Sequence, residues 1–171
     1  MRCAIVVAVA VLAAACSSSS EPLAFDLSHS IDFESDPPMV PFVVEGASAD
    51  AGVVCSGGTF TGAQEFDLDG NELSDEAWAD EFDQALETGG VAEMTAVKEF
   101  TCEDGSGTLV ITEDVRFDFS VIDPASLGTG EVATGTWTIE GLGDYEDLTG
   151  SGEAVVNFDQ ATFHYTGEVE D

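Results

Sequence analysis

The sequence predicts an all-β fold, an antiparallel barrel of roughly eight strands with one short helix. Apolar and polar residues alternate over most of the chain, which is the period of a strand with one buried face. The alternating segments are joined by short turns rich in Gly and Asp rather than by crossover helices. The segments at residues 108–120 and 131–140 are long, and a closed barrel leaves no such strand with an unpaired edge.

Three strands are expected before the helix. The first has an apolar face of Leu27, Ile31 and Phe33, the second covers residues 42–45, and the third covers residues 53–61 with a bulge or bend at its glycine pair.

The single helix follows Ser74, a residue type that favours the N-cap position. Trp78, Phe82 and Leu86 recur every four residues and form one apolar stripe, and paired glycines at 89–90 end the helix. The stripe is expected to pack on the sheet or to plug an open end of the barrel.

Five more strands complete the predicted barrel. In the fifth strand the odd-numbered positions are apolar except at 113, and the even-numbered positions are mostly polar, which makes it the clearest strand in the chain. The expected segments are residues 91–102, 108–120, 131–140, 154–158 and 163–169.

Two charged residues lie on the apolar faces of neighbouring strands. Glu113 lies between Ile111 and Val115, and Lys98 lies on the same face of its strand as the apolar residues. A carboxyl group inside an apolar barrel has a raised pKa and can act as an acid or a base, so Glu113 is a candidate catalytic residue with Lys98 as its partner. The alternatives are a bulge that turns one or both outward, or a purely structural buried pair.

Charge excludes some function classes. The chain has 35 Asp and Glu residues, 3 Lys and Arg residues and a net charge of −32. Nucleic acid and anionic lipid headgroups would both be repelled. An acidic surface suited to a saline exterior is favoured over a surface for a cationic partner, because the carboxylates are spread along the chain.

The N-terminus resembles a bacterial lipoprotein signal. A short apolar run at residues 4–15 follows Arg2, small residues precede Cys16, and serines at 17–20 follow it. This resemblance implies export, lipidation of Cys16, and a membrane anchor on the outer face of the cell membrane. The predicted divisions are 1–15 signal, 16–24 lipidated cysteine and tether, and 25–171 barrel domain. The alternative is an ordinary signal peptide in which Cys16 is incidental.

Two cysteines remain in the predicted barrel, Cys55 and Cys102. In an exported domain such a pair favours a disulfide bond. A metal site is the alternative, but the chain has no CxxC motif, and His29 and His164 stand alone in the sequence.

One acidic loop before the helix could hold calcium in an irregular site, with a solvated turn as the alternative. An EF-hand loop starting here would need Gly and Glu where Glu72 and Trp78 stand, so it is not an EF-hand. The candidate ligands are Asp67, Asp69, Asn71 and Asp75. No other cofactor is expected.

Two further motifs are excluded. The glycines at 141–143 resemble a phosphate loop, but three carboxylates and another strand follow them where such a loop needs a helix. The chain also contains no Gly-x-Ser-x-Gly elbow for a nucleophilic serine.

Five short stretches carry a resemblance to a known group: Gly-Thr-Trp-Thr-Ile (135–139), Gly-x-Gly-x-Tyr (141–145), Leu-Thr-Gly-Ser-Gly (148–152), Thr-Gly-Glu-Val (166–169), and the turn-containing segment 100–108. They resemble secreted bacterial proteins with an allene-oxide-cyclase-like or dirigent-like barrel, over residues 50–169. The resemblance implies a small eight-stranded barrel with a central cavity. No catalytic motif of the plant members matches this chain, so no activity is carried over.

The leading functional hypothesis is a non-catalytic envelope protein that binds a small apolar or aromatic molecule inside the barrel. The expected cavity residues are Phe117, Phe119, Trp137 and Tyr165. The alternatives are a cyclase-like or isomerase-like enzyme that uses Glu113, and a surface interaction protein with a filled barrel. The sequence predicts no oligomeric state.

Overall fold

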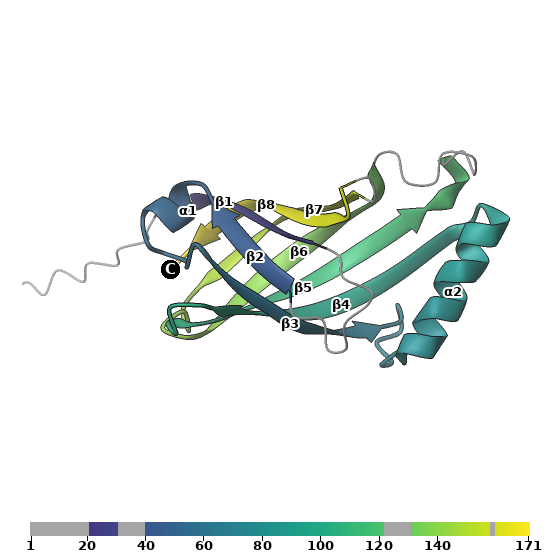
Figure 1. Ribbon diagram of the computed structural model, residues 1–171, viewed down its shortest axis with the longest axis horizontal. Helices are drawn as coiled ribbons and strands as arrows, with labels where there is room; N and C mark the ends of the chain where they lie inside the picture. The colour runs from purple at the N-terminus through teal and green to yellow at the C-terminus, as the bar shows by residue number, and fades with distance from the viewer. Residues whose placement is uncertain (1–20, 31–39, 122–130, 158–159) are drawn as a thin grey trace, which may run out of the picture.

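The protein is a closed antiparallel barrel in which every strand pairs with the next and the last pairs with the first. The computed structural model describes residues 21–30, 40–121, 131–157 and 160–171 (Figure 1). The predicted fold class is therefore confirmed. Cys16 and the signal segment lie outside the described residues, as do Ile31, Phe33 and Phe158.

The barrel has eight strands among the described residues, and helices account for little of the chain. The strands are β1 (Leu23–Ser30), β2 (Val40–Glu45), β3 (Gly57–Phe66), β4 (Val91–Cys102), β5 (Gly107–Asp118), β6 (Glu131–Gly143), β7 (Thr149–Asn157) and β8 (Thr162–Glu170). The helices are α1 (Ala47–Asp50), α2 (Asp75–Thr88) and the 3-10 turn η1 (Phe119–Val121). Strand β1 begins two residues before the predicted domain boundary.

The prediction for the third strand was wrong at its start. Cys55 precedes β3, because the chain after α1 is held in a turn by backbone bonds from Val53 and Val54 to the Ser48 carbonyl. The strand begins at Gly57, and its register shift falls between Phe60 and Gly62 rather than at the glycine pair.

Strand β6 also runs further than predicted. It continues to Gly143, and the chain then turns through residues 144–148 into β7, so the glycines at 141–143 end a strand of a hairpin. Gly141 is required by close packing, since a Cβ atom there would lie 1.9 Å from the Tyr145 carbonyl oxygen. This pairing of antiparallel strands agrees with the exclusion of a phosphate loop.

A glycine on β8 makes room for the largest core side chain. The indole nitrogen of Trp137 donates to the carbonyl oxygens of Glu153 and Thr166 at 3.1 and 3.3 Å. A Cβ atom at Gly167 would lie 2.8 Å from Cζ2 of Trp137. Gly167 of β8 therefore has a packing role beside this tryptophan.

Helix α2 lies across one end of the barrel (Figure 1). The Ser74 hydroxyl accepts a hydrogen bond from Ala77 N at 3.2 Å, and Gly89 ends the helix in the left-handed conformation. Its stripe packs on the barrel as predicted, with Phe82 contacting Phe117 and Phe119 at ring distances of 5.4 and 5.1 Å. Among the described residues, no helix is long and apolar enough to cross a bilayer.

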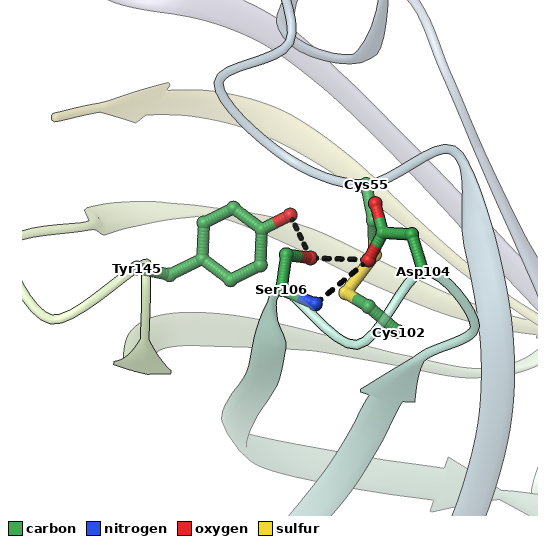
Figure 2. The surroundings of a disulfide bond; sticks show 5 residues. All are labelled: Cys55, Cys102, Asp104, Ser106 and Tyr145. Carbon is green, nitrogen blue, oxygen red and sulfur yellow. Dashed lines mark hydrogen bonds between the residues drawn. A yellow bond between two sulfur atoms is a disulfide. The ribbon is translucent and has the colours of Figure 1, made fainter.

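The predicted disulfide is confirmed. Cys55 and Cys102 are joined with an S–S distance of 2.04 Å. Figure 2 shows the bond beside the turn between β4 and β5, where Ser106 bonds to Asp104 and to the Tyr145 hydroxyl. The disulfide therefore fixes the segment before β3 to the end of β4.

Candidate functional site

Four ionisable or polar side chains lie in the interior of the barrel, and we call them the polar layer: His29, Lys98, Glu113 and Tyr165. They come from β1, β4, β5 and β8, and none is more than 4 % exposed. Such groups are costly to bury unless they are paired. The polar layer is therefore the strongest candidate for a functional site among the described residues.

The polar layer separates two apolar clusters. Along β4, Lys98 lies between Ala96 of the cluster beneath α2 and Phe100 of the cluster that fills the other half of the barrel. Along β5, Glu113 lies between Ile111 and Val115 in the same way. Both charges therefore occupy the middle of the barrel.

Strand pairing explains why the two charges meet. Lys98 is directly opposite Ile111, and Glu113 is directly opposite Ala96, so the two charges are diagonal neighbours on the inner face. The Lys98 Nζ atom is 2.6 Å from Oε1 of Glu113. The predicted pairing is confirmed, and the alternative of a bulge that turns either side chain outward is wrong.

Tyr165 completes this group. Its hydroxyl accepts a hydrogen bond from Lys98 Nζ at 2.9 Å. The Lys98 ammonium also lies 3.4 Å from the centre of the Phe163 ring, a cation–π contact. The lysine therefore contacts an anion, a hydroxyl and an aromatic face at once.

Burial changes the ionisation of this group. Desolvation lowers the pKa of Lys98 from its usual value, and the opposing attraction of Glu113 does not reverse this direction. Desolvation, and next the charge of Glu113, raise the pKa of Tyr165 well above its usual value, so the tyrosine is neutral. The site thus combines a lysine that loses its proton more readily than usual with a tyrosine that keeps its own.

His29 belongs to the site, although the sequence analysis left it unassigned. Its ring stacks between Phe60 and Phe163 at centroid distances of 4.9 and 5.0 Å. Burial, followed by the positive charge of Lys98, lowers the pKa of His29 to about 3, so its ring is neutral at neutral pH. The sequence could have placed His29 inside the barrel. His29 is two residues from Leu27 and therefore lies on the same, buried face of the strand.

The polar layer keeps unused hydrogen-bond acceptors. His29 Nδ1 lies 2.9 Å from the Ser30 carbonyl oxygen and donates to it, which leaves a lone pair on Nε2. Among the described residues, Nε2 of His29 and both carboxylate oxygens of Glu113 have no hydrogen-bond partner of good geometry. Oε1 of Glu113 is nevertheless paired by charge with the Lys98 ammonium, at 2.6 Å.

Solvent reaches the inner face of the barrel beside Lys98. Ala63 of β3 is directly opposite Lys98 and therefore shares the inner face, yet it is exposed. Glu65, two residues further along the same face, is half-buried, and desolvation with the nearby charge of Asp75 raises its pKa. Phe163 is half-buried as well. Part of the inner face next to the polar layer is therefore exposed to solvent.

The four predicted cavity residues belong to two different apolar clusters. Phe117 and Phe119 stack on each other and pack beneath α2. Trp137 and Tyr165 belong to the other cluster, in which Trp137 contacts Phe25 at 5.2 Å. An open hollow of about 590 Å³ on the barrel is lined by none of the four.

The acidic loop before α2 forms a self-contained turn. Asp67 accepts hydrogen bonds from the backbone of Asp69 and Asn71 and from the Asn71 side chain, at 2.8 to 2.9 Å. These bonds lower the pKa of Asp67. Within the described ranges no group of three or more His, Cys, Asp or Glu residues, Asp75 included, is arranged to hold a metal ion. The geometry matches the solvated-turn alternative.

The remaining histidine, His164, is exposed. Its Nε2 atom lies 2.6 Å from a carboxylate oxygen of Asp26 on the outer surface. It is therefore separate from the polar layer.

Comparison with known proteins gives no relative: no family model, no curated protein and no solved structure matches this chain.

Proposed function

We propose that this protein is an exported, lipid-anchored envelope protein that binds a small apolar or aromatic molecule in its barrel, at the polar layer. The observation that carries the proposal is a set of buried acceptors, on Glu113 and His29, that lie among aromatic rings close to the solvent-exposed Ala63. Apolar walls with a few convergent polar groups are typical of small-molecule sites.

The occupied volume of the barrel limits where such a molecule fits. Phe25, Phe42 and Trp137 are at most 2 % exposed, so the half of the barrel around them is filled by side chains. The ligand therefore enters on the α2 side, past Ala63 and Glu65, and its polar end meets Glu113 or His29.

A neutral fluorescent probe tests this proposal, because an anionic probe would be repelled by the protein. We expect N-phenyl-1-naphthylamine to bind saturably, with one site per chain. Ala63→Phe places a ring on the entry path and should abolish this binding, whereas Gln64→Phe, one residue along on the outer face, should leave it unchanged. Absence of saturable binding, or equal effects of both substitutions, contradicts the proposal.

The enzyme alternative rests on a different observation, the contact of Lys98 with both Glu113 and Tyr165. A binding protein should retain its ligand after Glu113→Gln. Native mass spectrometry of the exported protein would show whether an organic molecule stays bound, and conversion of that molecule by the wild type but not by Glu113→Gln would favour an enzyme.

The proposed location has its own test. Cys16→Ser should move the protein from the membrane fraction to the soluble fraction, because one thiol is the proposed lipid attachment site. An unchanged membrane association would contradict lipidation at Cys16.

A further inference from the structure

The chain has a single lysine, and that lysine is buried. Lys98 is 4 % exposed, whereas Arg116, the other cation of the predicted mature chain, lies on the surface. Lysine is almost never fully buried unless it is paired. A sequence that has so few cations yet keeps this one inside the barrel points to a use for the amine itself.

We propose that Lys98 is the attachment point for a carbonyl compound, an aldehyde or ketone with an apolar or aromatic body, which it holds as a Schiff base with Glu113 as counter-ion. This inference rests on the proposed function, since the compound must enter the barrel. It goes further by naming the reactive group of the ligand and the atom that holds it.

The contacts around Lys98 suit each part of this chemistry. Glu113 is 2.6 Å from the amine and is the only carboxylate among the described residues that is 0 % exposed. Tyr165 holds the nitrogen in place through its hydroxyl, and the exposed Ala63 lies on the inner face directly opposite the lysine. Burial favours an uncharged amine, which is the nucleophilic form. Arginine could not replace it, because its guanidinium group keeps its proton.

The reaction balances without an oxidant or a reductant. The Lys98 ammonium gives a proton to the Glu113 carboxylate, and the free amine nitrogen bonds to the carbonyl carbon. A proton moves from nitrogen to oxygen to give the carbinolamine. Glu113 returns its proton to the hydroxyl group, the C–O bond breaks, and water leaves. The nitrogen lone pair completes the C=N bond.

The product has the same pair of opposite charges as the site without the carbonyl compound. A protonated imine replaces the ammonium, and Glu113 is again a carboxylate beside it. The imine N–H can donate to Glu113, whose oxygens lack a directed donor among the described residues. A buried cation is therefore never left without its counter-ion.

Reductive trapping tests the proposal with benzaldehyde as the probe and cyanoborohydride as the reductant. The purified protein carrying Arg116→Lys provides an exposed amine in the same chain for comparison, and peptide mapping separates the two sites and the N-terminus. We expect Lys98 to be modified faster than the introduced amine, because burial lowers the pKa of Lys98 and so raises the fraction of free amine. Adding Ala63→Phe should abolish modification at Lys98 alone.

Two outcomes would overturn the proposal. One is an unmodified Lys98 in the folded protein when the same residue is modified in urea. The other is modification of Lys98 no faster than the exposed amine. If the naphthylamine probe still binds saturably, only the Schiff base is lost and the proposed function stands. If the probe does not bind either, both proposals fail.

Discussion

At the scale of single residues, the polar layer is where the chain departs from simple alternation. Lys98 and Glu113 occupy positions that an aliphatic residue would fill at lower desolvation cost. Their partners are well defined, since Lys98 contacts both Glu113 and Tyr165. These two charges are therefore expected to be coupled in stability as well as in function.

Removing one member of the pair should cost more than removing both. Lys98→Met leaves a buried carboxylate without its cation, and we expect a loss of about 3–5 kcal/mol in the free energy of unfolding. The double variant with Glu113→Leu should recover most of this loss. Urea unfolding measures both values. Additive costs in the double variant would show that the two side chains do not interact.

His29 should make the protein sensitive to acid. Its pKa is about 3 in the folded protein and near 6.5 in the unfolded chain, so between these values the unfolded chain binds more protons. Stability is therefore complete above pH 6.5 and falls as the pH falls towards 3. The loss should be on the order of 4 kcal/mol, at about 1.4 kcal/mol per pH unit.

The matched variant for this effect is His29→Phe, which keeps an aromatic ring between Phe60 and Phe163. Unfolding by urea at several pH values should show a flatter profile for the variant than for the wild type. Parallel profiles would mean that His29 is protonated in the folded protein.

At the scale of elements, α2 could be predicted and the segment before β3 could not. The helix is specified locally, by Ser74 at its start, a stripe at every fourth residue, and Gly89 at its end. The residues from Val53 to Cys55 are as apolar as a strand, but the Ser48 carbonyl accepts the backbone N–H groups of Val53 and Val54. The Ser48 carbonyl is in place to accept these bonds because α1 forms. That helix has only four residues and no side-chain N-cap, so the sequence around it does not predict it.

The stripe of α2 gives the prediction at this scale. Phe82→Ala removes ring contacts with Phe117 and Phe119 and should lower the free energy of unfolding by about 2 kcal/mol, less than a fully buried phenylalanine would. Asp83→Ala, on the exposed side of the same helix, should change it little. Equal effects in thermal unfolding would mean that the helix does not close this end of the barrel.

At the scale of the whole molecule, period-two alternation predicted the strands, and the length of two of them favoured a barrel, because closure leaves no strand with an unpaired edge. The Lys98–Glu113 pair followed from the same alternation. Alternation did not show that the predicted cavity residues belong to two clusters. It tells which face of a strand a side chain is on, but not how far along the barrel axis the side chain lies. Phe117 and Trp137 share the inner face but belong to different clusters.

The disulfide joins positions that are 47 residues apart in the sequence. Replacing Cys55 and Cys102 with alanine should lower the free energy of unfolding by about 2–5 kcal/mol, because the unfolded chain gains freedom. Urea unfolding of oxidised wild type, reduced wild type and the double variant should rank the first as most stable. Identical midpoints would show that the bond does not constrain the unfolded chain.

The burial of Lys98 also makes the folded chain a poor substrate for proteases that cut after lysine or arginine. In the described part of the chain only Lys98 and Arg116 offer such a bond. The first is enclosed in the barrel, and the second lies near the end of β5, paired with Glu93 of β4 and Thr134 of β6. Neither bond can enter a protease cleft as an extended segment until the strands separate. Cleavage by trypsin at these sites therefore reports the opening of the whole barrel, and its rate gives the population of the open state without any label.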